Sequence, residues 1–357
     1  MAHKITLCVL FGGQSSEHEV SRVSAASVIK NLDKEKYEIV TIGITKDGEW
    51  FMYRGPVEKI ASGEWEKVNN PRAVLSPDAR TGGIIKITDG ETTMARIDVV
   101  FPVLHGLYGE DGTVQGLLEL ANIPYVGSGV LASSLAMDKA YAKLVFKHVG
   151  IPQADWEVFY RNELKEMAQV VDRVEARFGY PCFIKPSNAG SSVGITKAHN
   201  RRELEEGLLI AAQHDRKIIV EEFINGREIE CSVLGNDEPE ASVLGEIIPS
   251  REFYDYDAKY NDDTSELIIP ASLPEETADK IREYAVKAFK ALDCSGFSRV
   301  DFFVHKETGE IYINEVNTIP GFTNISMYPK LWEASGLSYT SLLDRLIELA
   351  LDKKKNY

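Results

Sequence analysis

Residues 298–317 read SRVDFFVHKETGEIYINEVN, which is the pattern of a β-hairpin. Two runs rich in β-branched and aromatic residues, 300–305 and 310–316, flank the three-residue loop Glu307–Gly309. A loop of this length needs a residue in the left-handed region, and glycine supplies it. The loop therefore predicts which residues of the two strands face each other.

The predicted register brings two carboxylates together. Lys306 faces Glu310, and counting outward along the strands places Asp301 directly opposite Glu315. Because side chains alternate with period 2, each strand adds one more polar residue to this face. These residues are Arg299 and Asn317. The opposite face carries the residues expected to pack: Val300, Phe302, Val304, Tyr312 and Val316.

Facing carboxylates repel each other, because their Cβ atoms lie about 5 Å apart across a hairpin. A cation between them removes the repulsion. Asp301, Glu315 and the amide oxygen of Asn317 are hard ligands of the kind that Mg²⁺ takes alongside phosphate oxygens and water. The alternative is a solvated hairpin face on which Arg299 neutralises the charges.

Composition indicates a globular protein of about two or three domains. Of the 357 residues, 44% are hydrophobic and 27% are charged, and the net charge of −15 argues against nucleic acid or a membrane surface as a partner. The four cysteines have neither metal-ligand spacing nor the arrangement of a disulfide framework, which is typical of buried thiols in a reducing compartment. With no signal peptide and no apolar segment of about 20 residues, a cytoplasmic location is expected.

The N-terminal segment predicts a buried strand, a glycine turn and a helix. Residues 5–11 are continuously apolar, and Ser16 with Glu19 has the spacing of a capping box for a helix over 17–32. The turn lacks the G-x-G-x-x-G spacing of a dinucleotide site. Glu17 either complements the helix dipole or meets a substrate ammonium.

Two more buried strands are predicted at 37–44 and 98–104, with an irregular, peripheral insertion at 46–96 to which no chemistry is assigned. The later strand delivers His105 at its carboxyl end, where open α/β sheets bind ligands. His105 is either a structural histidine or a substrate contact. A short strand at 123–126 closes this first domain.

The second half of the chain begins with a helix at 138–149 and a strand at 182–186. A Gly/Ser loop, 187–194, follows that strand and offers backbone N–H groups to phosphates. It is not a Walker A loop, because Lys185 precedes it on the strand. Three further strands, 218–223, 227–234 and 241–247, are expected to form one antiparallel meander, and the polar loop after them is long enough to be functional.

Five motifs together resemble the D-alanine:D-alanine ligase family of the ATP-grasp superfamily, over a span from Gly12 to about Tyr339. The motifs are His-Gly-x-x-Gly-Glu-Asp-Gly from 105, Met-Asp-Lys ending at 139, Lys-Pro-x-x-x-Gly-Ser-Ser-Val-Gly from 185, Phe-Tyr-Asp-Tyr-x-x-Lys-Tyr ending at 260, and Asn-Glu-x-Asn-Thr-x-Pro-Gly-Phe-Thr from 314. The resemblance implies an α/β fold with a parallel N-terminal α/β domain at 1–126. A two-lobed ATP-grasp unit with antiparallel sheets is implied at 127–214 and 215–357.

The resemblance also implies an activity. ATP drives ligation of two D-alanines to D-alanyl-D-alanine through a D-alanyl phosphate, with ADP released, for peptidoglycan precursors of the cell wall. Two Mg²⁺ ions, which Mn²⁺ can replace, and a homodimer are implied as well. D-Serine or D-lactate as the second substrate remains the alternative, although Tyr260 matches the dipeptide-forming type. A nucleotide-gated binding protein without catalysis is the rival from another class.

Site residues follow from the same resemblance. Lys139 and Lys185 would hold the ATP phosphates, and Glu228 would bind the ribose. Other nucleotide contacts would come from Ser192, Glu221, Glu222, Phe223, Ile224, Lys259 and Asn314. Asp301, Glu315 and Asn317 would be the metal ligands.

The substrate residues fall into two groups. Glu17, Ser191 and Tyr260 would form a hydrogen-bonded trio near the first D-alanine, with His105 close by. The second D-alanine would have its carboxylate on Ser326 and the N–H of Met327, and Lys259 would be a further substrate contact. Arg299 and the N–H of Gly321 would stabilise the tetrahedral oxyanion.

Overall fold

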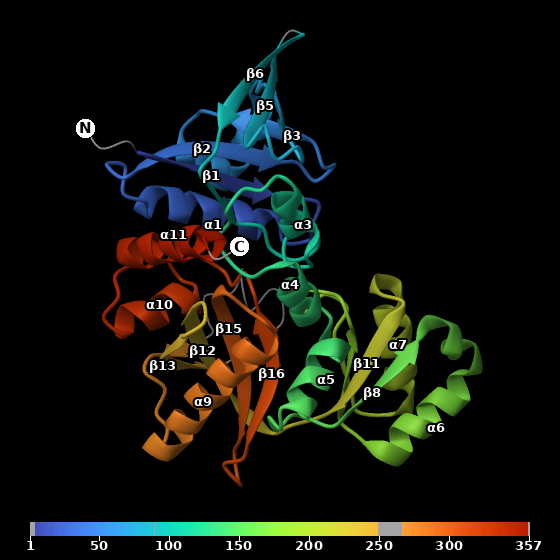
Figure 1. Ribbon diagram of the computed structural model, residues 1–357. Helices are drawn as coiled ribbons and strands as arrows, with labels where there is room; N and C mark the ends of the chain where they lie inside the picture. Colours follow the sequence, from blue (N-terminus) through green and yellow to red (C-terminus); the bar gives the residue numbers. More distant parts are fainter. Residues whose placement is uncertain (1–3, 89, 249–265, 356–357) are drawn as a thin grey trace.

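The computed structural model describes residues 4–88, 90–248 and 266–355. These residues form three β-sheets, of seven, four and five strands, with helices packed against them (Figure 1). The seven-stranded sheet lies at one end of the molecule and the other two lie at the opposite end. The mixed α/β class, with antiparallel sheets in the second half of the chain, agrees with the expectation from the sequence.

The first sheet has a parallel part built around β1 (Ile5–Gly12). This strand pairs in parallel with β2 (Tyr37–Ile44) and with β7 (Val99–Pro102), and every residue of β1 from Leu7 to Phe11 is fully buried. The continuous apolar runs of the sequence thus correspond to strands that are covered on both faces, as predicted.

Helix α1 (His18–Asn31) begins one residue later than predicted. Glu17 is its N-cap residue, and Ser15 Oγ accepts the Glu17 N–H at 3.0 Å. The predicted capping box is therefore wrong. The turn at Ser15 replaces it, which leaves the Glu17 carboxylate to point away from the helix end.

Residues 46–96 do not form an irregular insertion. Four antiparallel strands extend the sheet from β2 in the order β3, β4, β5 and β6, and the fully buried Trp65 packs edge-on against Phe11. The prediction is wrong because these strands are short and separated by glycine and proline turns, so alternation is hard to detect. The elements are β3 Trp50–Tyr53, α2 Val57–Ser62, η1 Glu64–Lys67, β4 Arg72–Leu75, β5 Gly83–Thr88 and β6 Glu91–Arg96.

The second sheet has the strand order β10-β9-β11-β8, with α6 and α7 covering it. The predicted three-stranded meander is wrong for its first strand, because β11 pairs with β8 and β9, and only β12 and β13 pair with each other. Periodicity reports burial but not which sheet buries a strand. The elements are β8 Trp156–Tyr160, η2 Arg161–Glu166, α6 Met167–Arg177, β9 Cys182–Pro186, β10 Thr196–Ala198, α7 Arg201–His214 and β11 Lys217–Glu222.

The third sheet has the order β14-β13-β12-β15-β16. Helix α9 packs on β12 and β13, as does α10. The elements are β12 Gly226–Gly235, β13 Glu240–Ile248, β14 Glu266–Ile268, α9 Glu275–Ala291, β15 Gly296–His305, β16 Ile311–Asn317 and α10 Met327–Ala334. Helix α3 Thr113–Leu120 packs on the first sheet, and α4 Val130–Met137 and α5 Lys139–His148 pack in the core of the third sheet.

The hairpin of β15 and β16 has the predicted pairs, Asp301 opposite Glu315 and Arg299 opposite Asn317. The loop that connects the two strands differs from the predicted one. The His305 N–H donates to the Glu310 carbonyl, so the loop starts at residue 306 and is one residue longer than predicted.

A β-bulge corrects the offset. Phe302 pairs with Ile313, and Asn314 is the extra residue before the Asp301–Glu315 pair. Because of this bulge Ile313, with 1% of its surface exposed, packs in the core in place of Tyr312, which is only partly buried. Tyr312 is therefore not one of the packed residues.

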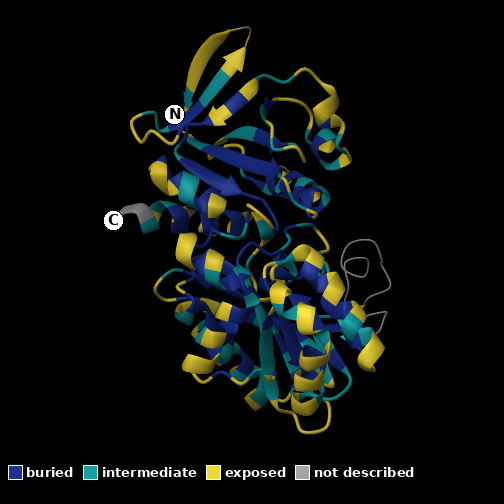
Figure 2. Cartoon of the chain, turned by 90° about the vertical axis from the view of Figure 1, so that its right-hand side faces the viewer, coloured by how far each residue is buried: buried dark blue, intermediate teal, exposed yellow. Residues whose placement is uncertain are grey.

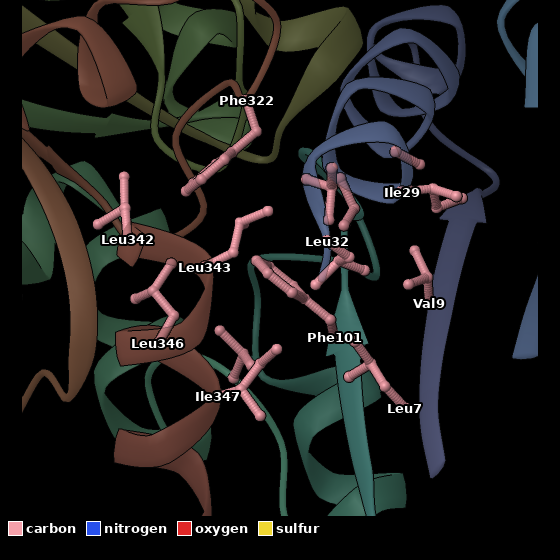
Figure 3. Close-up of a cluster of buried hydrophobic side chains, with 14 of the residues drawn as sticks. Leu7, Val9, Ile29, Leu32, Phe101, Phe322, Leu342, Leu343, Leu346 and Ile347 are labelled. Atoms are coloured by element: carbon pink, nitrogen blue, oxygen red, sulfur yellow. The ribbon is translucent and has the colours of Figure 1, made fainter. Parts of the chain in front are cut away.

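Helix α11 (Tyr339–Lys355) returns from the third unit and packs against α1 and β7 of the first. Figure 3 shows Leu342, Leu343, Leu346 and Ile347 of α11 facing Leu7, Phe101 and Phe322. Buried positions fill the central strands of the sheets, while β6 and the outer helix faces are exposed (Figure 2).

We propose that the boundaries of the three units follow sheet membership. The sequence places them at 1–126, 127–214 and 215–357, but β11 belongs to the second sheet. The second unit then extends through Glu222. The third unit begins with β12.

Candidate active site

A cavity of about 900 Å³ is lined by residues of all three units. Its walls are α1, the Gly/Ser loop, the hairpin of β15 and β16, and the segment that leads to α10. Most of the residues predicted for catalysis and substrate binding line it, together with some of those predicted to bind nucleotide and metal. They are Glu17, His105, Lys139, Ser191, Ser192, Arg299, Glu315, Asn317, Gly321, Ser326 and Met327.

The hairpin carboxylates are balanced by cations of the chain. Arg299 binds both oxygens of Asp301 at 2.7 Å and also reaches Glu230 at 3.0 Å, and Lys139 Nζ lies 3.7 Å from Glu315 Oε2. Burial alone lowers the pKa of Arg299, but the surrounding carboxylates raise it well above its usual value. The guanidinium is therefore a fixed positive charge at the cavity wall.

The same face presents oxygen donors for a metal ion. Within the described ranges, no three His, Cys, Asp or Glu side chains come together as a metal group. The donors are two carboxylates and the Asn317 amide, whose Nδ2 donates to Asp301 Oδ2 at 3.0 Å. This set fits Mg²⁺, which takes one or two carboxylates when phosphate oxygens and water complete its shell.

Glu17 meets the Gly/Ser loop as expected. Ser191 Oγ donates to Glu17 Oε1, which joins the loop to the first unit. A Cβ added at Gly190 would lie 2.4 Å from Glu17 Oε2, and one at Gly106 would lie 2.3 Å from it. Both glycines are therefore needed for the close approach of Glu17.

A second carboxylate, the half-buried Glu110, lies beside Glu17. It accepts the N–H of Gly106 at 2.8 Å and the N–H of Ile319 at 2.9 Å. Burial and the negative charge of Glu17 raise the pKa of Glu110 to about 8. Glu110 thus connects the first unit to the segment after β16, and its raised pKa favours the protonated form.

His105 is structural in its contacts. Its Nδ1 lies 2.9 Å from the Ile319 carbonyl and its Nε2 lies 3.0 Å from Ser24 Oγ. Burial lowers its pKa to about 4. The neutral ring donates from Nδ1, because a carbonyl can only accept, and Ser24 Oγ in turn accepts the Phe322 N–H at 3.3 Å. His105 therefore holds the 319–322 segment rather than offering a free nitrogen.

The N-terminus of α10 forms the far wall. Ser326 is the N-cap residue, and its side chain makes no cap hydrogen bond to the helix. Its Oγ accepts the Thr323 N–H at 3.0 Å, and a Cβ at Gly321 would lie 2.9 Å from it. Gly321, Ser326 and the Met327 N–H thus line one site, and the positive end of a helix suits a carboxylate.

A buried lysine and glutamate cluster lies behind Lys139. Glu221 is 2.7 Å from Lys185 Nζ and 3.3 Å from Lys143 Nζ, and all three side chains are nearly inaccessible. Burial alone raises the pKa of Glu221, but the two ammonium groups outweigh it and hold the pKa at about 2. Lys185 also reaches Asn314 Oδ1 at 3.4 Å.

The other predicted nucleotide residues surround this cluster. Glu222 Oε1 accepts the Asp155 N–H at 2.7 Å, and the Phe223 ring lies 6.2 Å from that of Phe183. Ile224 follows in the link to β12, where Glu228 is partly buried. Tyr260 and Lys259 lie outside the described residues.

Sequence reasoning missed Lys143, Glu110 and Glu230. Lys143 is four residues after Lys139, so both lie on one face of α5, and that spacing could have identified it. Glu110 lies within a motif that was recognised but gave it no role. Glu230 pairs with Asp301 across β12 and β15, a neighbour that only the sheet order reveals.

Comparisons with known proteins agree with this geometry. A family model described as D-ala D-ala ligase N-terminus matches residues 6–128, and one described as D-ala D-ala ligase C-terminus matches residues 145–348. A D-alanine–D-alanine ligase of Acetivibrio thermocellus is 59% identical, with 99% of this chain and 97% of the relative covered. One from Clostridium acetobutylicum is 56% identical, with 98% and 99% covered.

Solved structures are similar as well. VanG D-Ala:D-Ser ligase from Enterococcus faecalis has a TM-score of 0.88 at 44% identity, covering 98% of this chain and 100% of that one. The D-alanine-D-alanine ligase from Coxiella burnetii has a TM-score of 0.86 at 37% identity, covering 99% and 96%.

The three-unit architecture and the lysine- and carboxylate-lined cavity define an ATP-dependent ligase of the ATP-grasp class. Within that class, the chain belongs to the D-alanine–D-alanine ligase family. No helix of the described ranges is long and apolar enough to cross a membrane.

Proposed function

We propose that the protein joins two D-alanines to D-alanyl-D-alanine at the expense of ATP, with D-alanyl phosphate as the intermediate. One observation carries the proposal: a single cavity is lined by Lys139, expected to hold phosphate, and by the Glu17, Arg299 and Ser326 groups expected to hold amino acids. The dipeptide would serve peptidoglycan precursor synthesis and hence cell shape.

The reaction needs activation because a carboxylate is a poor acylating agent. A carboxylate oxygen of the first D-alanine attacks the γ-phosphorus of ATP, which forms an acyl phosphate and releases ADP. The free amine of the second D-alanine then attacks the acyl carbon. Collapse of the tetrahedral adduct expels inorganic phosphate and leaves the peptide bond.

Each step has a group in the cavity suited to it. Glu17, held by Ser191, would bind the ammonium of the first D-alanine. Arg299 and the Gly321 N–H would stabilise the oxyanion of the tetrahedral adduct. Ser326 and the Met327 N–H at the start of α10 would bind the carboxylate of the second D-alanine.

ATP would lie between the second and third units. Lys139 and Lys185 would bind its phosphates, Glu221 to Ile224 the adenine, and Glu228 the ribose. Asp301, Glu315 and Asn317 would hold Mg²⁺ or Mn²⁺, which would neutralise charge on the transferred phosphoryl group. The two-ion arrangement expected from the sequence is part of this proposal.

D-Serine is the second candidate for the second substrate. The observation that favours it is the likeness to the Enterococcus faecalis structure, which is named a D-Ala:D-Ser ligase. The relatives at 56% and 59% identity are named D-alanine–D-alanine ligases, and they support the main proposal.

Phosphate release tests the function directly. Purified protein with ATP, Mg²⁺ and D-alanine is expected to release phosphate and to form D-alanyl-D-alanine, identified by mass spectrometry. Parallel reactions with D-serine or D-lactate beside D-alanine would show which mixed product forms. A lack of D-alanine-dependent phosphate release would reject the ligase, and a predominant mixed product would reject the dipeptide assignment.

We also propose a homodimer in the cytoplasm. All four cysteines are free and buried, as expected in a reducing compartment. Large apolar side chains are exposed on α3 and α4, Leu120 at 67% and Leu131 at 58%, and they are candidates for a dimer contact. Light scattering of the wild type and of Leu120→Asp would test this, since a dimer held there should dissociate.

A further inference from the structure

The N-terminus of α5 is bonded to the first residue of the Gly/Ser loop. Helices begin with N–H groups that lack partners in the helix. Here the Lys139 N–H donates to the Ser187 carbonyl at 3.0 Å and the Ala140 N–H donates to Ser187 Oγ at 3.3 Å. The Tyr141 N–H donates to Asp138 Oδ1 at 3.3 Å. Ser187 is therefore docked on the helix end.

Asp138 is the centre of this arrangement. Its Oδ1 accepts the Ser187 hydroxyl at 2.6 Å, and its Oδ2 accepts Asn188 Nδ2 at 3.2 Å and pairs with Lys217 Nζ. Burial alone raises its pKa, but Lys217 and the hydrogen bonds outweigh this and lower it. One ionised carboxylate thus ties α5, the loop stem and β11 together.

The contacts of Ser187 with Asp138 and the start of α5 fix the distance between two lysines that are remote in sequence. Lys139 directly follows Asp138 on α5, and Lys185 precedes Ser187 by two residues at the end of β9. Lys139 Nζ also donates to the Ala189 carbonyl at 2.7 Å, the next part of the loop. A shift of Ser187 relative to Asp138 would therefore move the lysines apart.

We propose that Asp138 and Ser187 are positioning residues that set the spacing of Lys139 and Lys185 for the ATP phosphates. This inference rests on the proposed function. Neither residue is proposed to touch the nucleotide. Both act through the lysines, so their loss should weaken nucleotide binding while the amino-acid sites, formed by other elements, stay unchanged.

Two double variants separate the effect of the Asp138 hydrogen bonds from the effect of the Asp138–Lys217 ion pair. Asp138→Ala with Lys217→Met removes the acceptor of Ser187 and Tyr141, whereas Asp138→Asn with Lys217→Met keeps an oxygen acceptor there. Both remove the same pair of charges, and neither leaves a buried lysine alone. Because two hydrogen bonds differ between them, the affinity for ADP should differ by about tenfold or more.

The measurements are ADP affinity by calorimetry, KM for ATP, KM for D-alanine and Tm. For the alanine variant we expect ADP affinity to fall and KM for ATP to rise about tenfold, with KM for D-alanine unchanged, while the asparagine variant stays within about threefold of the wild type. Ser187→Ala keeps the ion pair and should show the same rise in KM for ATP with an unchanged KM for D-alanine. It replaces the alanine double variant in the test if that variant fails to fold.

Equal losses in the two double variants would overturn the proposal, because the ion pair with Lys217 would then be responsible. So would a parallel rise of both KM values with a fall in Tm, or an unchanged ADP affinity in Ser187→Ala. The proposed function fails separately, if the wild type releases no phosphate with ATP and D-alanine. ADP calorimetry tests the positioning role whether or not the wild type turns over.

Discussion

At the residue scale, the facing carboxylates of the hairpin have cations of the chain beside them. Arg299 pairs with Asp301, and Lys139 lies within 3.7 Å of Glu315. Such pairing lets Asp301 and Glu315 stay close together without a metal ion. Arg299 also contacts Glu230, so it keeps a partner if Asp301 turns to another cation.

Glu315→Gln should abolish turnover while the fold is kept, because one charge is lost at the phosphoryl-transfer site and side-chain volume is conserved. Loss of transition-state charge stabilisation is expected to cost about 10²-fold or more in kcat. The measurement is phosphate release at saturating Mg²⁺, with Glu310→Gln, at the exposed end of the hairpin, as the control. Retention of more than about a tenth of wild-type activity would contradict the metal-site assignment.

Glu110 gives a pH dependence of stability. Its pKa is raised from 4.5 to about 8 in the folded protein, so the folded state keeps a proton that the unfolded chain releases. Its contribution is complete below pH 4.5 and is lost as the pH rises toward 8. Glu17→Gln removes the negative neighbour, should lower the Glu110 pKa and should therefore reduce this loss.

The comparison is urea unfolding of the wild type and of Glu17→Gln at pH 5.5 and pH 8. The wild type should lose more stability between the two values, by about 1.4 kcal/mol for each pKa unit that the substitution removes. Parallel pH profiles would mean that Glu17 does not influence the titration of Glu110.

Residue-level prediction from the sequence worked where spacing carried the information. The Asp301–Glu315 pair follows from strand alternation and a glycine loop, and both residues of the pair are confirmed opposite each other. Lys143 could have been identified by its four-residue spacing from Lys139. Glu110 could not be told from a surface charge, because its partner Ile319 is distant in sequence. The Glu17–Ser191 contact came from the family resemblance and not from any local pattern.

At the element scale, the bulge in β16 reconciles two features that otherwise conflict. The longer loop would shift the register by one residue, and Asn314 shifts it back before Glu315. A prediction from the sequence reached the right register through an incorrect loop length, since two offsets of one residue cancel. A count from the loop cannot detect a bulge. The three-residue spacing of Ile313 and Val316 marks it, but the apolar Tyr312 fits a regular alternation with Val316 and hides that spacing.

Deleting Asn314 should therefore leave the pairing of Asp301 with Glu315 intact. The shortened strand would continue in the regular ladder from Ile313 to Glu315, with Val316 still packed. We expect the deletion variant to fold and its KM for ATP to rise. The rise should equal that of Asn314→Ala, because in both variants Lys185 loses its contact with Asn314 Oδ1. Circular dichroism and ATP kinetics check this. An unfolded deletion variant would show that the bulge itself is required.

At the scale of the whole molecule, α11 joins the last part of the chain to the first. Its apolar face packs against β7 and α1, and the cluster includes Phe297 and Phe322 near the active site. No element was predicted for this helix from the sequence, and an amphipathic pattern would not show where it docks, because any exposed apolar face would satisfy it. The order of the three units along the chain could be predicted only from the family resemblance.

Leu346→Ala should destabilise the protein by about 2–5 kcal/mol, because Leu346 is fully buried at this contact and its loss leaves a cavity. Arg345→Ala, on the exposed side of α11, is the control and should change stability by about 0.5 kcal/mol or less. Urea unfolding measures both. A loss below about 1 kcal/mol for Leu346→Ala would mean that α11 contributes little to the first unit.

The position of α11 also bears on synthesis. A nascent chain folds from its N-terminus while the ribosome adds about 5–20 residues per second. The strand face around Leu7 and Phe101 emerges early, yet its covering residues near Leu346 are translated only after residues 102–341. The first unit therefore exposes an apolar face for roughly tens of seconds, and we expect that face to be accessible to holdase chaperones during the interval.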